Sequence, residues 1–494
     1  MTQAVIIGGY LVLLLGLGIF SGRFFRGTSS DYFVASRSIG SFMLLMSVFG
    51  TTMTAFAMVG STGEAFRVGI GTYGKLASYS GLIHSACFFF VGLKLWELGK
   101  RNGYLTQIQF FRDRFQSDAL GYLLFPILVM LVVPYLLIGL LGAGAVVKGV
   151  TRGAFPEFFI ATNGAIPPWL TGLVICSVVL CYIFIGGVRS AAWANTFQTL
   201  VFMVMGILAF FLIAKGLGGL EAASAQADES KMVREGNMTY LEFFSYGLIP
   251  LSVGMFPHLF QHWLTAKSAK SFRLTLIAHP VCIMLTWVPC ILIGLWATGV
   301  FPEAKPNAVL GMMVAEFAGP IMGGLVTAGV LAAIMSSLDS QFVCLGTMFT
   351  QDIVIHKFGK GKFTDRQIMN MARGFVVVIV LVTYGLSLLE PRQVFSLGVW
   401  CFSGFASLFP IVFAALYWKR VTKWGAMAGV LATVIAWIVL FVLSDYGANR
   451  HFLVLGAQPV VFIFLSCLVS LVVVSLFTKA PEDEILAKFF KKVK

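Results

Sequence analysis

Apolar runs of about 20 residues recur from one end of this chain to the other. As helices, such runs are long enough to cross a hydrocarbon core of roughly 30 Å. Of the 494 residues 58% are apolar and 11% are charged, whereas a soluble domain carries about 25% charged residues. The sequence therefore predicts an all-α, polytopic membrane protein embedded in a lipid bilayer and excludes a soluble protein.

We expect about thirteen transmembrane helices, because that many separate runs reach the length needed to span. They cover residues 3–20, 41–66, 74–97, 120–147, 167–187, 193–215, 241–264, 274–299, 319–346, 367–389, 394–417, 425–444 and 457–477. The first run has neither a basic segment before it nor a small-residue cleavage site after it. We therefore expect a retained helix rather than a signal peptide.

Lysine and arginine are unevenly distributed between the loops of this chain, whose net charge is +14. Reading alternate loops as cytoplasmic assigns most of these residues to one side, as the positive-inside rule describes. They are Arg23, Arg26, Arg37, Lys100, Arg101, Arg112, Arg114, Arg189, Lys267, Lys270, Arg273, Lys357, Lys360, Lys362, Arg366, Lys419, Arg420, Lys423 and five lysines of the tail. This predicts a bacterial-type inner-membrane protein with its N-terminus outside and its C-terminus cytoplasmic, and it explains the basic charge without nucleic acid.

Two of the predicted helices contain residues that interrupt a helix, at residues 50–54 and 252–257. Glycine and β-branched polar residues dominate the first segment, and the second contains Pro257, whose ring clashes with the carbonyl of Val253. A single kink is commonly a packing feature. Unwound backbone at membrane depth, however, is tolerated only where it is buried or lines a cavity. Interruptions at comparable places in two halves therefore predict a transporter binding site.

The predicted helix at 319–346 contains a concentrated polar patch at its centre. Ala333, Ser336 and Ser337 form one edge, whose hydroxyl and carbonyl oxygens are ligands that a hard cation prefers. Carbonyls freed at Gly50 and Met53 could complete the shell. The alternative is that the serines bond to carbonyls of their own helix.

Asp339 lies in the same patch, and an ionisable group inside a membrane costs on the order of 3 kcal/mol or more. It therefore predicts a nearby cation or a proton.

The eight cysteines and six histidines form no metal-ligand pattern. The cysteines lie within or beside apolar runs, so no disulfide framework is expected. His258 and His262 have the i, i+4 spacing of helical metal ligands, but no carboxylate or cysteine accompanies them. We expect no transition metal and no enzyme active site.

Five groups of residues together resemble one transporter family over roughly residues 30–430. They are Asp31-Tyr32 with Arg37-Ser38-Ile39-Gly40; Phe184-Ile185-Gly186-Gly187 with Trp193 and Gln198; Gly254 with Pro257-His258; Ala332-Ala333-Ile334-Met335-Ser336-Ser337; and Phe405, Pro410 and Trp418-Lys419-Arg420 with Gly425-Ala426. On these motifs the chain resembles the sodium:solute symporters. The resemblance implies a secondary active symporter that couples inward sodium movement to uptake of a small polar organic solute by alternating access.

The resemblance also implies a leucine-transporter-type core of two inverted five-helix repeats. A monomer is a separate expectation, which no motif in the sequence fixes. The corresponding parts of the chain are an extra N-terminal transmembrane helix (1–25), the first repeat (26–215), an external loop (216–240), the second repeat (241–424), two accessory transmembrane helices (425–477) and a cytoplasmic tail (478–494).

Carried onto this sequence, the family's sodium site falls on the carbonyls of Gly50, Met53 and Ala333 and the hydroxyls of Ser336 and Ser337. This is the polar edge described above. Sodium is accordingly the expected coupling ion.

A second ion site would involve Asn195, Asp339 and Ser340. The family often has aspartate at the position of Asn195, so the negative charge has moved to the neighbouring helix. We hypothesise that Asp339 replaces the lost carboxylate.

The solute pocket is expected between the two interruptions, lined by Thr52, Thr54, Ser252 and Phe256, with Tyr79 and Trp400 as further candidates. Small hydroxyls suit a carboxylate, an amino acid, a sugar or a similar solute equally. Proline-transporting members have an acidic residue where Thr52 stands, so proline is not the expected solute. Glu64 and Arg67, near the external end, are interpreted as a gate or surface pair.

Two alternatives to sodium symport stay open. Asp339 could carry a proton, because a membrane carboxylate serves proton relays as well as cation sites. A membrane sensor built on a transporter scaffold is the other alternative, although a signalling module would then be expected beside the membrane domain.

Overall fold

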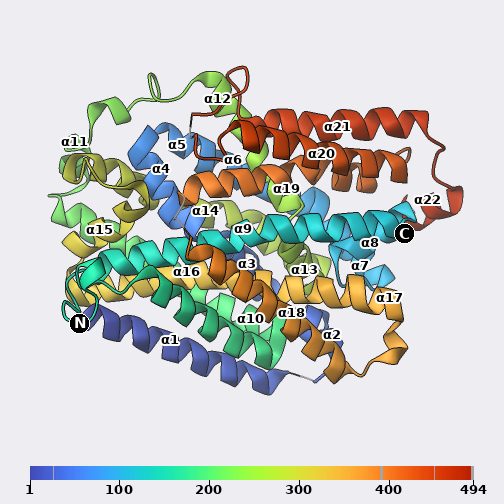
Figure 1. Ribbon diagram of the computed structural model, residues 1–494, viewed down its shortest axis with the longest axis horizontal. Coiled ribbons are helices and arrows are strands. Elements are labelled where there is room, and N and C mark those ends of the chain that lie inside the picture. The colour runs from blue at the N-terminus through green and yellow to red at the C-terminus, as the bar shows by residue number, and fades with distance from the viewer. Residues whose placement is uncertain (26, 390–392, 450, 491–494) are drawn as a thin grey trace.

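The computed structural model describes residues 1–25, 27–389, 393–449 and 451–490. Its regular structure is helical (Figure 1), and the described residues contain two isolated β-bridges but no named strand. The predicted all-α class is confirmed. Arg26 and the tail residues 491–494, all predicted to be cytoplasmic, lie outside the described residues, as does the side chain of Lys360.

Ten helices in the described ranges are long and apolar enough to span a membrane. Seven of them carry a single label: α1 (Thr2–Ser21), α9 (Asp118–Val150), α10 (Pro168–Gly216), α18 (Asp365–Ser387), α19 (Val394–Tyr417), α20 (Lys423–Leu443) and α21 (Pro459–Phe477). The other three combine shorter elements: Gly71–Asn102 contains α5 (Gly71–Tyr73), α6 (Tyr79–Cys87) and α7 (Leu93–Asn102), Ala269–Val300 contains α14 (Phe272–Val300), and Gly319–Phe358 contains α16 (Gly319–Met348) and α17 (His356–Phe358).

Two further spans are bent at the interruptions that the sequence predicts. The first runs from α3 (Ser41–Thr52) into a π-helical turn and α4 (Ser61–Val68), with a bend of 58°. The second runs from α12 (Tyr240–Ser245) through a 3-10 segment into α13 (Pro257–Thr265), with a bend of 50°. Pro257 is the first residue of α13, a position where its missing N–H costs no helical hydrogen bond.

α10 is long enough for two spans. Its 49 residues would extend about 73 Å at 1.5 Å per residue. At Gly187 the backbone leaves the helical region, with φ 54° and ψ −134°. The two segments on either side match the predicted helices at 167–187 and 193–215. With α10 counted as two spans, the ten long helices become eleven, and the two bent spans bring the described total to thirteen. This total agrees with the number that the sequence predicts.

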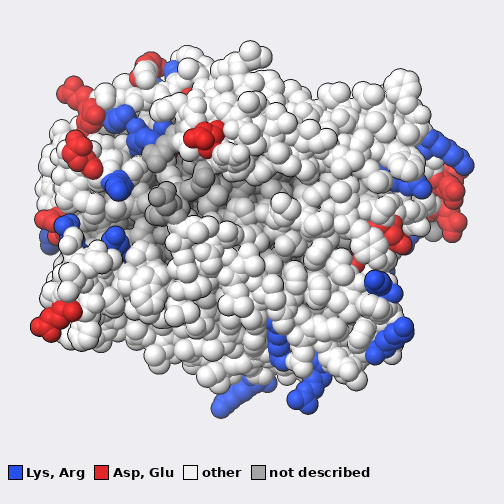
Figure 2. Space-filling view, in the orientation of Figure 1, with Lys and Arg blue, Asp and Glu red and all other residues white. Residues whose placement is uncertain are grey.

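Shorter helices cover the ends of the bundle. They are α2 (Ser29–Val34), α8 (Gln107–Phe115), α11 (Leu220–Ala225), α15 (Val309–Phe317) and α22 (Asp483–Phe490). The N-terminus and α22 lie at opposite ends of the long axis (Figure 1). Lys and Arg lie toward both ends of the visible face, mixed with Asp and Glu at the end away from α22, and the middle of this face is largely uncharged (Figure 2). An uncharged band between charged ends is what a bilayer requires.

α16 lies at the centre of the bundle. In its most apolar segment 83% of the residues are buried, against 50% or less in the other helices among the ten long ones, except α19. It packs against α10, α9, α1, α18, α3 and α13. The polar patch of α16 is therefore enclosed by protein and does not face lipid, as a membrane-embedded polar group requires.

The break inside α10 at Gly187 can be tested by adding a side chain at this position. A Cβ at this position would lie 2.4 Å from the backbone oxygen of Tyr32, and the positive φ disfavours any side chain. We expect Gly187→Ala to lower the free energy of unfolding by about 2 kcal/mol or more. The midpoint of thermal unfolding in detergent measures the loss.

Gly374→Ala in α18 is the matched control, because an added Cβ meets no atom within 4 Å there. Equal stability of the two variants would contradict the strained turn at Gly187.

Candidate functional site

The break after α3 meets the centre of α16 through one side chain. The Ser336 hydroxyl lies 2.7 Å from the Gly50 carbonyl oxygen and 2.9 Å from that of Ala333, and it can donate to either. Ser336 and Ala333 are fully buried. A Cβ on Gly50 would lie 2.3 Å from the Thr199 hydroxyl, so this close approach requires glycine. Three residues of the predicted sodium site thus meet at one junction of oxygen atoms.

The other two predicted ligands lie on the same two segments. Met53 is extended, with φ −90° and ψ 97°, because α3 ends at Thr52. Ser337 is buried and accepts a hydrogen bond of 2.6 Å from Gln341 Nε2. Among the described residues, no hydrogen bond links Met53 or Ser337 directly to the Gly50–Ser336 pair.

Asp339 is surrounded by neutral hydrogen-bond donors. Tyr182 donates to its Oδ2 at 3.0 Å, and the Ser340 hydroxyl oxygen lies 3.1 Å from its Oδ1. With the Asn195 amide oriented to satisfy both of its ends, Nδ2 lies 3.0 and 3.1 Å from the two carboxylate oxygens. His262 Nε2 is 2.9 Å from the Ser340 hydroxyl. The three residues of the predicted second ion site therefore lie together.

The Asp339 carboxylate is fully buried. Within the part of the chain that the structure describes, no lysine, arginine or histidine nitrogen lies within 4 Å of it. A buried carboxylate without a positive partner is costly. A bound cation or a proton would remove this cost.

The two polar sites are continuous. The Ser340 hydroxyl is 3.2 Å from the Ser336 carbonyl oxygen, and the reoriented Asn195 amide is 3.1 Å from that same oxygen. Ser336 therefore joins the Gly50 junction to the Asp339 cage. Sequence reasoning missed Tyr182 and His262, which come from α10 and α13 and carry no motif that pairs them with Asp339.

A cavity lies between the two interrupted spans, with an empty volume of about 400 Å³. It is lined by Thr52, Phe56, Ser80, His84, Tyr135, Tyr246, Ile249, Pro250, Ser252, Val253, Phe256, Trp287 and Phe402. The predicted residues Thr52, Ser252 and Phe256 are among these. His84, Ser80, Tyr135 and Trp287 were not predicted, because they come from neighbouring spans without a helix break.

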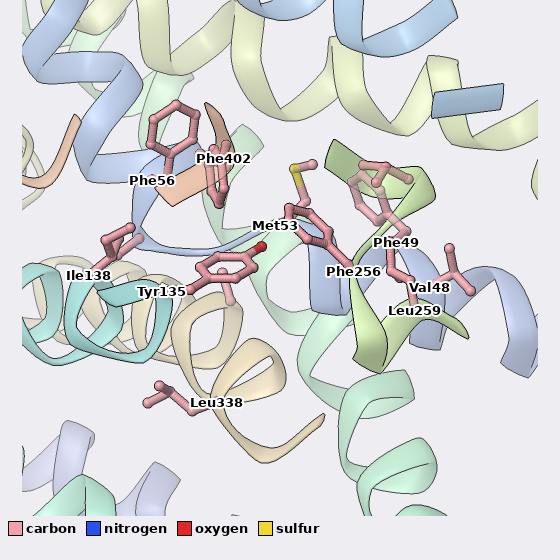
Figure 3. Packing of buried hydrophobic residues seen from close by; sticks show 14 of the residues in the cluster. Val48, Phe49, Met53, Phe56, Tyr135, Ile138, Phe256, Leu259, Leu338 and Phe402 are labelled. Carbon is pink, nitrogen blue, oxygen red and sulfur yellow. The ribbon is translucent and has the colours of Figure 1, made fainter. Parts of the chain in front are cut away.

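Aromatic rings form one wall of this cavity (Figure 3). The Phe402 ring lies 4.9 Å from the rings of Phe56 and Tyr135, and the Phe256 ring lies 5.2 Å from that of Tyr135. Phe56 follows the α3 break directly, and Phe256 ends the second break. The two breaks therefore present apolar rings as well as polar backbone to the same cavity.

The other three predicted pocket residues do not line this cavity. The Thr54 hydroxyl accepts from the Phe56 N–H at 3.0 Å and so stabilises the turn. Tyr79 packs its ring 5.4 Å from that of Phe243. Trp400 lines a separate, outer cavity.

The outer cavity has an empty volume of about 610 Å³ and contains a buried ion network. Glu64 Oε1 lies 2.6 Å from Lys75 Nζ and 3.0 Å from Arg67 Nη2. The predicted Glu64–Arg67 pair thus has a third, buried member in Lys75. Tyr246 lines both cavities, and the centre of its ring lies 5.5 Å from Lys75 Nζ.

The ion network predicts a strong effect of removing one charge. Glu64→Gln leaves the Lys75 ammonium buried without a carboxylate, and we expect it to lower the free energy of unfolding by about 3 kcal/mol or more. The double variant Glu64→Gln/Lys75→Met removes the stranded charge and should regain much of this loss. Thermal unfolding of the purified variants measures both effects. Additive losses would show that the two charges do not interact.

A family model described as the Sodium:solute symporter family matches residues 32–433. The Sodium/proline symporter of Haemophilus influenzae is 25% identical, over 98% of this chain and 96% of the relative. The Sodium/proline symporter of Escherichia coli is also 25% identical, over 97% and 94%. An uncharacterized symporter of Bacillus subtilis is 24% identical over 87% of each chain.

Solved structures with a similar fold agree over nearly the whole chain. A Na⁺-coupled sialic acid symporter superposes with a TM-score of 0.76 at 16% identity, covering 98% of this chain and 99% of the other. Mhp1, a nucleobase-cation-symport-1 family transporter, gives 0.55 at 13% identity, covering 93% and 98%. This likeness confirms the predicted leucine-transporter-type fold, and the family match establishes that the chain belongs to the sodium:solute symporter family.

Proposed function

We propose that this sodium-coupled symporter binds its coupling ion at the junction of the α3 break and α16, and its solute in the adjacent cavity. The observation that carries the proposal is the contact of the Ser336 hydroxyl with the Gly50 carbonyl. The proposed sodium ligands are the carbonyls of Gly50, Met53 and Ala333 and the hydroxyls of Ser336 and Ser337. Oxygen ligands of this kind suit a hard monovalent cation.

Coupling follows from the shared backbone of the two sites. Gly50 lies at the ion junction, and Thr52, two residues later, lines the cavity. An ion that fixes the carbonyl of Gly50 also fixes the cavity wall, so each ligand would favour the conformation that the other binds. α3 and α16 fall in the two proposed repeats, 26–215 and 241–424, so sodium would also hold the repeats in one relative position.

We further propose the orientation that the loop charges predict, with the N-terminus outside and the α22 end in the cytoplasm of a bacterial inner membrane. Inward movement of one positive charge then contributes about 2.3 kcal/mol per 100 mV of membrane potential. That supports roughly a fiftyfold solute gradient. One chain contains both repeats and the whole cavity, so we propose that a monomer is sufficient for transport.

Ser336→Ala tests the sodium site, because it removes a hydroxyl and keeps the helix. We expect the sodium affinity to fall about tenfold or more, measured as the sodium concentration that gives half-maximal thermal stabilisation. Thr327→Val is the matched control on α16, since the Thr327 hydroxyl bonds only to the Gly323 carbonyl of its own helix. An unchanged sodium midpoint in Ser336→Ala would remove Ser336 from the site.

Proton coupling through Asp339 is the second candidate mechanism. The observation that supports it is the absence, among the described residues, of a positively charged partner for this buried carboxylate. A cation and a proton neutralise the carboxylate equally well. The two mechanisms differ in whether Asp339 controls the sodium dependence of uptake or its pH dependence.

Asp339→Asn separates these mechanisms. If Asp339 holds a second sodium ion, the variant should lose sodium cooperativity in uptake while the pH dependence stays unchanged. The charge-swap variant Asn195→Asp/Asp339→Asn should then restore the cooperativity, because it returns a carboxylate to the same cage. If Asp339 carries a proton, the sodium titration should stay intact and the pH dependence of uptake should disappear.

A further inference from the structure

The inner cavity is rich in hydrogen-bond donors and has no acidic wall. None of the residues that line it in the described structure is aspartate or glutamate. Its polar lining instead includes Ser80, His84, Ser252 and Trp287. A donor-rich cavity without a carboxylate favours a solute that presents hydrogen-bond acceptors.

Trp287 supplies a donor that the protein leaves unused. Its side chain is 4% exposed, and its Nε1–H has no hydrogen-bond partner among the described residues. An indole nitrogen can only donate, and a buried donor without an acceptor costs about 1–3 kcal/mol. A solute with an acceptor group in this cavity would remove that cost.

His84 supplies a second donor through its pairing with His279. His84 Nδ1 lies 3.2 Å from His279 Nε2, while His279 Nδ1 is buried without a partner in the described structure. Buried N–H groups without partners are rare, so the favoured tautomer of His279 carries its proton on Nε2 and donates it to His84. The neutral His84 ring then has its own proton on Nε2 and can donate into the cavity.

The remaining lining is largely apolar, with hydroxyl groups only on Thr52, Tyr135 and Tyr246 among the described lining residues. Its rings and aliphatic side chains come from Phe56, Tyr135, Ile249, Phe256 and Phe402, among others. A sugar would leave many hydroxyls unpaired against this wall, at a cost for each. An ammonium group would lack a carboxylate partner on the described lining.

We propose that the cavity binds a small monocarboxylate with an apolar body, whose carboxylate accepts hydrogen bonds from Trp287 Nε1 and His84 Nε2. This inference rests on the proposed solute site and names its substrate class. Co-transport of this anion with one sodium ion moves no net charge, and any additional cation makes transport respond to membrane potential.

The test is thermal stabilisation of the purified full chain by a matched set of probes, with sodium or with potassium. The carboxylates are acetate, butyrate, hexanoate and benzoate. Butyramide removes the charge, 2-aminobutyrate adds an ammonium group, and glucose represents a polyol. We expect one or more carboxylates to stabilise the protein in sodium, with butyramide, 2-aminobutyrate and glucose showing at least about tenfold weaker effects.

Two tryptophan variants locate the binding group. Trp287→Phe keeps an aromatic ring and removes the N–H, so the affinity for the stabilising carboxylate should fall about tenfold or more. Trp296→Phe, on the same helix, is the matched control, because its Nε1 donates to Ser224 and it does not line the cavity. His84→Leu should weaken binding similarly, and His84→Gln, which retains a donor, should recover part of it.

The outcomes separate this inference from the function on which it rests. Sodium-dependent stabilisation by 2-aminobutyrate or glucose, with none by the carboxylates, overturns the monocarboxylate class and leaves sodium symport standing. Carboxylate binding that is equal in sodium and potassium contradicts the coupling between the two sites. Equal carboxylate affinity in Trp287→Phe and Trp296→Phe removes Trp287 from recognition, and no stabilisation by any of the four carboxylates overturns the inference.

Discussion

The hydrogen bond between the Ser336 hydroxyl and the Gly50 carbonyl joins the break in α3 to the central helix α16. A helix that breaks inside a membrane frees backbone groups, and lipid offers them no partner. Here the α3 break is buried against α16, the central helix of the bundle, and a serine hydroxyl meets the freed carbonyl. The hydroxyl and carbonyl oxygens that meet at this contact are of the kind that a hard cation prefers.

The polar interior of the bundle is arranged as one connected path. Ser336 touches the α3 break on one side, and its own carbonyl accepts from the Asp339 cage on the other. A change in charge at Asp339 can therefore affect the Gly50 carbonyl through the two hydrogen-bonded residues that lie between them. The negative charge of this region lies on α16, within 3.1 Å of the Asn195 amide of α10.

The sequence was most informative where one physical rule controls a long segment. Apolar length predicts the spans, and Gly50, the threonines that follow it and Pro257 predict the two bends because helix interruption is a local property. The ligand edge on α16 was predictable for the same reason, since Ser336 and Ala333 are one turn apart on one helix. Pocket residues were harder: Thr54 was expected in the pocket, yet its hydroxyl stabilises the turn at Phe56.

By itself, then, the sequence determined the all-α membrane class and the positions of the spans and breaks, and it offered candidate residues for an ion site. Only the tertiary structure decided which distant side chains complete the sites. Tyr182 and His262 reach the Asp339 cage, and His84 and Trp287 reach the inner cavity, from four different helices. The physical reason is that helix periodicity relates residues three or four positions apart, whereas contacts between helices depend on packing angles and register that no single segment encodes.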